Sequence, residues 1–234
     1  MTNNDNNKML LWVIPLALLL SHVACAQPKI SILGDSYSTF YGHVEPEENL
    51  CWYGVPGENK KNDVIKVQDT WWNLLVETGN YQLECNNSYS GSTVCNTGYN
   101  GADYSDRSFI TRMTALGTPD IIIVFGGTND SWAGVPIGEN CYSTWEAESL
   151  YSFRPAFCYL LDYLTHHYSS AKVFNITNTN LSEDIVRAMA DICQHYNVVN
   201  ICLHDIDKQQ GHPSVRGMRA IASQVLEMLN VVAD

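Results

Sequence analysis

Four short polar segments of the sequence contain residue types that together could perform nucleophilic catalysis at a carbonyl group. Ser36 lies in the first segment and His212 in the last. A serine hydroxyl is a poor nucleophile at neutral pH unless a positioned base removes its proton during the attack, and histidine is the commonest base. We therefore take Ser36 as the candidate nucleophile and His212 as the candidate base. The four segments are 34–38, 87–92, 126–130 and 211–213.

The two middle segments supply candidate donors for the negatively charged oxygen that forms when a serine attacks a carbonyl carbon. Such an oxyanion needs hydrogen-bond donors aimed at it, and the backbone N–H groups of Ser36 and Gly91 with the side-chain amide of Asn129 would supply them. Glycine at position 91 would permit a close backbone approach. Plainer interpretations exist, because Ser36 could cap a helix and both Gly91 and Asn129 suit ordinary turns. Asp130 would then only stabilise its loop.

The pattern of apolar residues predicts how these segments are brought together. Apolar runs alternate with helical patterns, which is typical of a parallel sheet covered by helices. The run 121–125 is apolar without alternation, so we expect it near the centre of the sheet. Because loops after parallel strands meet at one edge of the sheet, the four segments could converge there. The expected strands are 29–33, 82–86, 120–125, 172–177 and 198–203.

Capping residues and apolar periodicity predict the intervening helices. Asp69 and Asp106 are candidate caps, and Pro155 suits a first turn. Ser182 precedes another helical pattern, and the last helix begins at about Ser214. Two stretches, 41–68 and 131–150, interrupt this rhythm, and we expect them to shape the substrate-binding surface. Their aromatic residues, whose faces could stack on sugars, are Trp52, Tyr53, Trp132, Tyr142 and Trp145.

The first 26 residues have the composition of a secretory leader. Lys8 precedes the apolar run 9–20, and Ala24-Cys25-Ala26 follows with the small residues that signal peptidase prefers. A membrane anchor is the alternative, but about 12 apolar residues fall short of the roughly 20 needed to span a bilayer. We predict a signal peptide over 1–26, one domain over 27–234, and export. A lipid anchor at Cys25 is a further alternative, which His22 disfavours.

Charge and cysteine content limit the classes of partner. The net charge of −12 disfavours nucleic acid and anionic membrane surfaces and suits a neutral or weakly charged substrate. No Cys-x-x-Cys or His-Glu-x-x-His spacing occurs, so we expect no metal site. The predicted mature chain has an odd number of cysteines, and export permits disulfides.

Taken in order, the four segments resemble the SGNH hydrolases, also called the GDSL esterase/lipase superfamily. The Ser, Gly, Asn and His of that name correspond to Ser36, Gly91, Asn129 and His212. The resemblance extends from the first strand to the last helix, and favours an exported, carbohydrate-esterase-like bacterial branch. It implies an α/β fold, a flavodoxin-like three-layer α/β/α sandwich with a central five-stranded parallel sheet. It also implies hydrolysis of ester, thioester or acetyl groups without a metal or organic cofactor.

The sequence departs from the family pattern behind the histidine. Family members commonly carry Asp three residues before it, where this chain has Gln209, which cannot stabilise an imidazolium by charge. Asp207 is our candidate for the residue that orients His212. Asp205 is an alternative, and so is a Ser–His dyad oriented by a backbone carbonyl. His204 is the nearest rival to His212 as the base.

These observations predict an exported serine esterase that hydrolyses ester groups, O-acetyl groups on carbohydrate in particular, through a Ser–His acyl-enzyme mechanism. The partner would be a small-molecule or glycan ester. A lysophospholipase or lipid esterase is the alternative enzyme. An inactive glycan-binding protein on the same scaffold is the alternative outside enzymes, and Gln209 is its only support in the sequence.

Overall fold

The computed structural model describes residues 26–58 and 61–233. Residues 1–25 of the predicted leader, Cys25 included, lie outside them. None of the helices in the described part of the chain combines the length and the apolar character that a membrane crossing requires.

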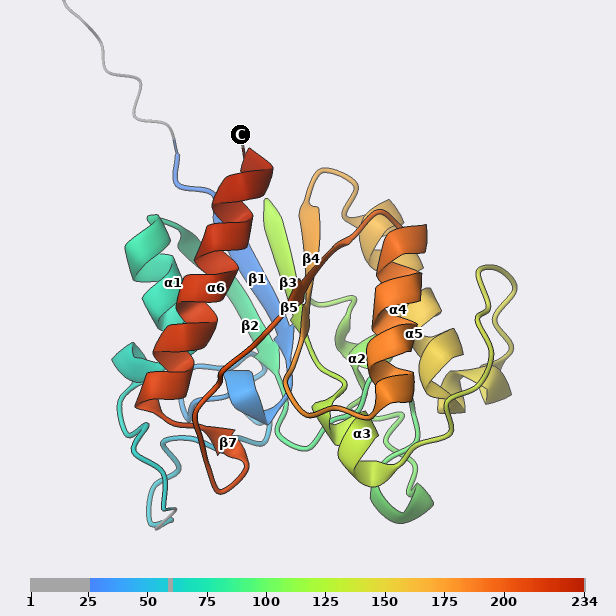
Figure 1. Ribbon diagram of the computed structural model, residues 1–234, viewed down its shortest axis with the longest axis horizontal. Coiled ribbons are helices and arrows are strands. Elements are labelled where there is room, and N and C mark those ends of the chain that lie inside the picture. The colour runs from blue at the N-terminus through green and yellow to red at the C-terminus, as the bar shows by residue number, and fades with distance from the viewer. Residues whose placement is uncertain (1–25, 59–60, 234) are drawn as a thin grey trace, which may run out of the picture.

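A five-stranded parallel sheet forms the centre of the molecule (Figure 1), as the sequence predicted. Its strand order is β2-β1-β3-β4-β5, so the chain leaves β1 in one direction and returns to β3 on the other side. A reversal of this kind opens a crevice beyond the carboxyl ends of the two strands, here β1 and β3. The strands are β1 Lys29–Gly34, β2 Gln82–Ser88, β3 Ile121–Phe125, β4 Lys172–Thr177 and β5 Val199–Cys202.

Helices cover both faces of the sheet and make it a three-layer α/β/α sandwich. Helices α1 and α6 pack on one face, and α2, α4 and α5 pack on the other (Figure 1). Strand β3 supplies buried side chains to both layers, Ile122 and Val124 to one and Ile123 and Phe125 to the other. Its unbroken apolar run is therefore explained by burial on both faces. The helices are α1 Trp71–Gly79, α2 Phe109–Arg112, α3 Thr128–Ala133, α4 Phe153–His167, α5 Glu183–His195 and α6 Val215–Ala233.

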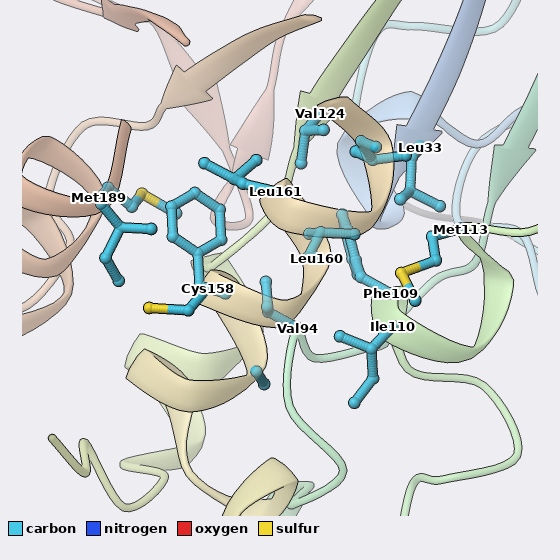
Figure 2. Close-up of a cluster of buried hydrophobic side chains, with 14 of the residues drawn as sticks. Leu33, Val94, Phe109, Ile110, Met113, Val124, Cys158, Leu160, Leu161 and Met189 are labelled. Atoms are coloured by element: carbon cyan, nitrogen blue, oxygen red, sulfur yellow. The ribbon is translucent and has the colours of Figure 1, made fainter. Parts of the chain in front are cut away.

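The layer of α2, α4 and α5 contains a dense apolar cluster, shown in Figure 2. Cys158 on α4 and Cys193 on α5 are buried in it. Cys202, at the end of β5, is exposed.

Two predicted helix caps are wrong by one and two residues. The side chain of Thr70, not Asp69, accepts the N–H of Asn73 at the start of α1, because Asp69 closes a preceding 3₁₀ turn, Val67–Asp69. Ser108, not Asp106, precedes α2, which is only four residues long. Ser182 directly precedes α5, without a side-chain hydrogen bond to the helix, and Pro155 lies in the first turn of α4, as predicted. The remaining 3₁₀ turns are Ser36–Ser38, Tyr99–Gly101 and Ala147–Tyr151.

A short antiparallel hairpin between β5 and α6 was not predicted. It pairs β6 Lys208–Gln209 with β7 His212–Pro213, and its two turn residues, Gln210 and Gly211, both have positive φ. Such turns suit the twist of a two-residue hairpin. The hairpin packs so tightly on α6 that a Cβ atom at Gly217 would lie 2.1 Å from the carbonyl oxygen of Asp207.

We predict that Gly217→Ala destabilises the protein by roughly 1 to 3 kcal/mol, because the added methyl group must push the hairpin from the helix. Alanine normally stabilises a helix interior by about 1 kcal/mol relative to glycine. Urea unfolding of this variant and of Arg216→Ala, at the exposed neighbouring position, measures the effect. A more stable Gly217→Ala protein would contradict the packing described above.

Candidate active site

Ser36 begins a 3₁₀ turn, Ser36–Ser38, directly beyond β1. The turn is fixed at its start because the Asp35 carboxylate accepts the N–H of Tyr37 at 3.0 Å. The N–H of Asp35 also donates to the carbonyl of Phe125, at the end of β3, at 3.3 Å. The turn thus lies between the ends of β1 and β3, at the crevice that the strand order creates. Ser36 is nearly buried there, with 3% of its surface exposed.

His212, on β7 of the hairpin, meets this serine. Its Nε2 lies 2.9 Å from Ser36 Oγ, and its Nδ1 lies 3.2 Å from the carbonyl oxygen of Gln210. A carbonyl can only accept a hydrogen bond, so the contact assigns the proton to Nδ1. Nε2 then carries the lone pair that a general base needs, and it faces the serine hydroxyl.

Asp207 is not where we predicted it. The hairpin register places Asp207 beside Ser214, and its carboxylate accepts a hydrogen bond from the Ser214 hydroxyl. Gln209 is directed to the 41–68 stretch, where its side-chain oxygen accepts the N–H of Asp63 at 2.9 Å. The Gln210 carbonyl is thus the orienting group that the geometry brings to Nδ1 of His212.

The rival base and the other alternative carboxylate lie at the surface. His204 and Asp205 pair with each other at 3.1 Å, and their side chains are 74% and 96% exposed. Neither is positioned to serve Ser36.

The loop after β2 carries Gly91 with φ of 84°, a conformation that favours glycine. This loop is tied to β1 by a hydrogen bond from the N–H of Tyr89 to the carbonyl of Gly34, at 3.1 Å. The N–H groups of Ser36 and Gly91 donate no hydrogen bond within the described residues, so both are available to a ligand.

Asn129 lies in the first turn of α3, immediately beyond β3. Its Nδ2 donates to the carbonyl of Ser92 at 2.9 Å, and its Oδ1 accepts the hydroxyl of Tyr99 at 2.8 Å. These two bonds fix the orientation of the amide, and one N–H remains to donate elsewhere. The structure thus brings the segments of Ser36, Gly91, Asn129 and His212 to one edge of the sheet. The sequence did not predict α3.

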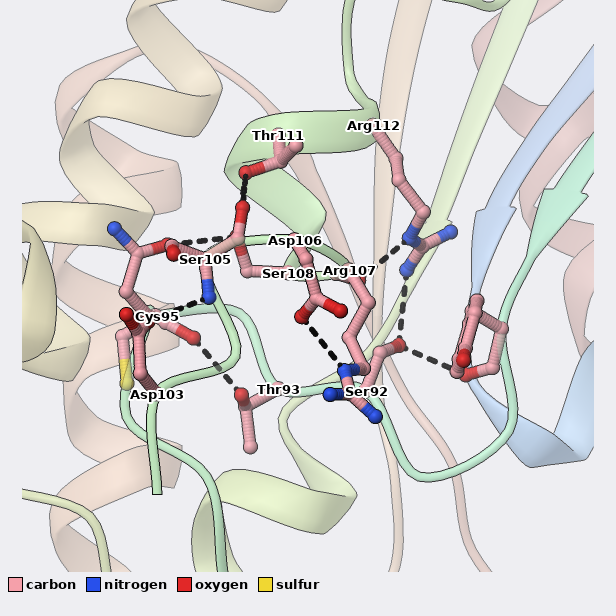
Figure 3. A network of polar contacts seen from close by, with 12 residues as sticks. Ser92, Thr93, Cys95, Asp103, Ser105, Asp106, Arg107, Ser108, Thr111 and Arg112 are labelled. Carbon is pink, nitrogen blue, oxygen red and sulfur yellow. Dashed lines mark hydrogen bonds and ion pairs between the residues drawn. The ribbon is translucent and has the colours of Figure 1, made fainter. Parts of the chain in front are cut away.

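A buried arginine connects the strands beneath the site and was missed by the sequence analysis. Arg112, on α2, donates to the hydroxyl of Ser92 (Figure 3). It also donates to the carbonyls of Asn87 and Gly34. It therefore ties β1 to the loop that carries Gly91. Burial lowers the pKa of the Arg112 guanidinium to about 9, and the nearby Asp35 carboxylate raises it. A basic residue in the apolar pattern of α2 is the only sequence signal for it.

Two buried carboxyl groups accompany this guanidinium. Asp130 accepts the backbone N–H groups of Val94 and Cys95, so it stabilises a loop, as one interpretation of the sequence had it. Burial raises the pKa of Asp130 to about 6, and these N–H bonds oppose the shift. Burial raises the pKa of Asp35 to about 7, the Tyr37 N–H bond opposes this, and repulsion from Asp130 adds to it.

Aromatic rings surround the histidine. Trp52 stacks on the His212 ring at a centroid distance of 3.7 Å and an interplanar angle of 7°. Trp132, which is 46% exposed, approaches the same ring at 6.0 Å and 70°. Tyr142 and Trp145 do not join them, because Tyr142 stacks on His195 of α5 and Trp145 packs on Tyr159 of α4.

No group of three or more His, Cys, Asp or Glu residues within 26–58 and 61–233 is arranged to hold a metal ion.

Comparison with known proteins shows the family to which the chain belongs. The model of the GDSL-like lipase/acylhydrolase family matches residues 28–229. A crystal structure of a GDSL-like lipase from Bacteroides uniformis is 65% identical with a TM-score of 0.87, over 88% of this chain and 96% of that one. A second GDSL-like lipase, from Bacteroides ovatus, is 49% identical with a TM-score of 0.86, over 88% and 100%. No curated protein matches the sequence.

More distant structures share the fold. A family two carbohydrate esterase from Cellvibrio japonicus is 17% identical with a TM-score of 0.58, over 89% of this chain and 63% of that one. The fold and the family together define a hydrolase of ester bonds. The chain belongs to the GDSL-like lipase/acylhydrolase family, which confirms the resemblance to the SGNH hydrolases.

The raised pKa of Asp35 gives the free energy of unfolding a predictable pH dependence. Between pH 3.8 and about 7, Asp35 keeps a proton in the folded state that the unfolded chain releases. The contribution of this protonated carboxyl group to the free energy of unfolding is fully present below pH 3.8. It is lost as the pH rises through about 7. Asp35→Asn cannot ionise and keeps an oxygen for Tyr37. We therefore predict that its stability relative to wild type rises by roughly 1 to 4 kcal/mol across this window.

Urea unfolding at several pH values measures this difference. Asp205→Asn, at an exposed position with positive φ that both residues tolerate, is the control for removing a surface carboxylate. A constant difference between Asp35→Asn and wild type at every pH would refute the prediction.

Proposed function

We propose that this ester hydrolase is a serine esterase in which Ser36 is the nucleophile and His212 the general base. The observation that carries the proposal is the 2.9 Å contact between Ser36 Oγ and His212 Nε2, with Nδ1 directed at a backbone carbonyl. This arrangement supports a Ser–His dyad, one of the three alternatives that the sequence left open.

The proposed reaction has two halves. In the first, His212 takes the Ser36 proton as Oγ attacks the acyl carbon, and then gives that proton to the departing alcohol. In the second, water attacks the acyl-enzyme, His212 takes its proton, and Ser36 leaves with that proton. The N–H groups of Ser36 and Gly91 and the free amide N–H of Asn129 would stabilise the oxyanion in both halves.

An O-acetyl ester of a carbohydrate is the substrate class that we propose. Trp52 and Tyr53 line a surface pocket of about 210 Å³ together with polar Asn62, a mixture that suits a sugar ring. The net charge of −12 agrees with a neutral substrate. The carbohydrate esterases among the fold neighbours show only that this fold can carry such an activity.

A lipid ester is the second candidate, because the 41–68 stretch also exposes large apolar side chains. Tyr41, Leu50 and Ile65 are 54%, 57% and 72% exposed. Leu50 also adjoins the Gly91 loop, since its carbonyl accepts the N–H of Ser90 at 2.8 Å. Such side chains would suit an acyl chain at the site entrance.

Hydrolysis of a small activated acetate ester tests the mechanism. We predict that Ser36→Ala and His212→Ala each lower kcat/KM by at least roughly a thousandfold, because each removes one member of the reacting pair. Circular dichroism controls for folding. Turnover by wild type no faster than by Ser36→Ala would refute the proposed mechanism and favour a glycan-binding role.

Hydrolysis assays with two natural types of ester distinguish the two substrate classes. Release of acetate from acetylated xylan, without release of fatty acid from lysophospholipid, is the expected result for wild type. The reverse result would favour the lipid ester.

We also propose that the enzyme is exported, on the basis of the leader-like composition of residues 1–26. Mass spectrometry of the protein purified from its native cells is expected to find a mature N-terminus at Gln27. An acylated N-terminal Cys25 would indicate a lipid anchor, and an intact leader would contradict export.

A further inference from the structure

The histidine-bearing hairpin is held by aromatic residues from the first quarter of the chain. The backbone carbonyls on either side of His212 both accept phenol hydroxyls, that of Gly211 from Tyr37 at 2.5 Å and that of Pro213 from Tyr53 at 2.9 Å. The loop that carries the base is therefore fixed by residues around the nucleophile turn. These bonds fix its backbone but leave the imidazole plane undetermined.

The Gln210 carbonyl orients that plane through Nδ1, and Trp52 covers its face. Its indole lies parallel to the imidazole, at 3.7 Å and 7°, whereas Tyr37, Tyr53 and Trp132 all meet the ring at 51° or more. A ring rotated about its Cβ–Cγ bond would lose this face-to-face contact. It would also lose the contacts of Nε2 with Ser36 and of Nδ1 with the Gln210 carbonyl.

The backbone of Trp52 is fixed relative to the nucleophile itself. The N–H of Trp52 donates to Thr39 Oγ1 at 2.9 Å, and that hydroxyl donates to the carbonyl of Ser36 at 3.0 Å. One threonine hydroxyl thus sets the distance between the indole and the reacting serine. The base is placed by the same short segment that places the nucleophile.

His212 needs electrostatic stabilisation during proton transfer. When His212 takes the Ser36 proton it becomes an imidazolium, and a carbonyl on Nδ1 offers a dipole where a carboxylate would offer a full charge. The face of an indole carries negative potential and attracts a cation, more strongly where the pair is shielded from water. We propose that Trp52 is the positioning residue that replaces the carboxylate, holding the imidazole plane and stabilising the imidazolium. This inference rests on the proposed Ser36–His212 mechanism.

Several other ionisable groups lie near the hairpin. Burial raises the pKa of the Tyr37 and Tyr53 phenols, which are therefore neutral at physiological pH. The Lys208 ammonium lies 5.5 Å from the Tyr37 ring, and a cation there opposes a second positive charge. The carboxyl groups on the elements packed around the hairpin are those of Asp35, Glu58, Asp63 and Asp207.

Two measurements on Trp52→Leu, which keeps an apolar cover without an aromatic face, test the inference. NMR titration of the His212 ring is expected to show its pKa falling by about one unit, because the cation loses its stacking partner. With a small acetate ester, kcat is expected to fall about tenfold with little change in KM. Trp145→Leu, the same change in a tryptophan packed on α4, should alter neither quantity.

Trp52→Phe keeps a smaller aromatic face and is expected to lie between wild type and Trp52→Leu in both measurements. If Trp52→Leu does not fold, Trp52→Phe decides: a smaller fall in the His212 pKa supports the inference. An unchanged His212 pKa in the folded variants would overturn it. The titration can be repeated in a Ser36→Ala background. A failure of the Ser36 mechanism is therefore distinguishable from a failure of the Trp52 inference.

Discussion

The hydrogen bond between Ser36 and His212 joins two residues that are 176 positions apart in the chain. It forms only if β1 delivers the serine and the hairpin before α6 delivers the histidine to the same crevice. The sheet order provides that crevice, because the chain changes direction between β1 and β3. The tight contact between Gly217 of α6 and the hairpin backbone then fixes the position of the hairpin, and with it His212, relative to the crevice.

The interior of the protein near this hydrogen bond, at the edge of the sheet, contains charged side chains. Arg112, Asp35 and Asp130 are all buried there, although burial of charge is unfavourable without compensation. The compensation comes from backbone groups: Arg112 donates to carbonyls at the ends of β1 and β2, and Asp130 accepts N–H groups of the Val94 loop. The charges thereby fix loops that have little regular secondary structure of their own.

The sequence was sufficient to predict the fold, and it gave four candidate site residues whose segments the structure brings to one edge of the sheet. Apolar runs located all five strands to within two residues, because burial on both faces leaves a clear pattern in β3 and its neighbours. Ser36, Gly91, Asn129 and His212 were selected as candidates because their residue types are those that the proposed chemistry needs. Asp207 was expected behind the histidine for the same reason, since a carboxylate is the side chain that most often fills that role.

Two features of the site could not be assigned from residue types, although a backbone carbonyl behind His212 was one of the alternatives that the sequence left open. The partner of Nδ1 is a backbone carbonyl, which any residue at position 210 would provide, and it depends on a two-residue turn with positive φ. The stacking of Trp52 on His212 depends on the path of a long loop, as does the separation of Trp145 from the site. Only the packed structure distinguishes these two tryptophans.

The central claim is that Ser36 is a nucleophile activated by His212. Its most direct test is reaction with an alkyl fluorophosphonate, which captures an activated serine without any assumption about the natural substrate. Peptide mass spectrometry should find the phosphonyl group on Ser36 in wild type, with much slower labelling in His212→Ala. Labelling at another residue, or at an equal rate in His212→Ala, would contradict the account.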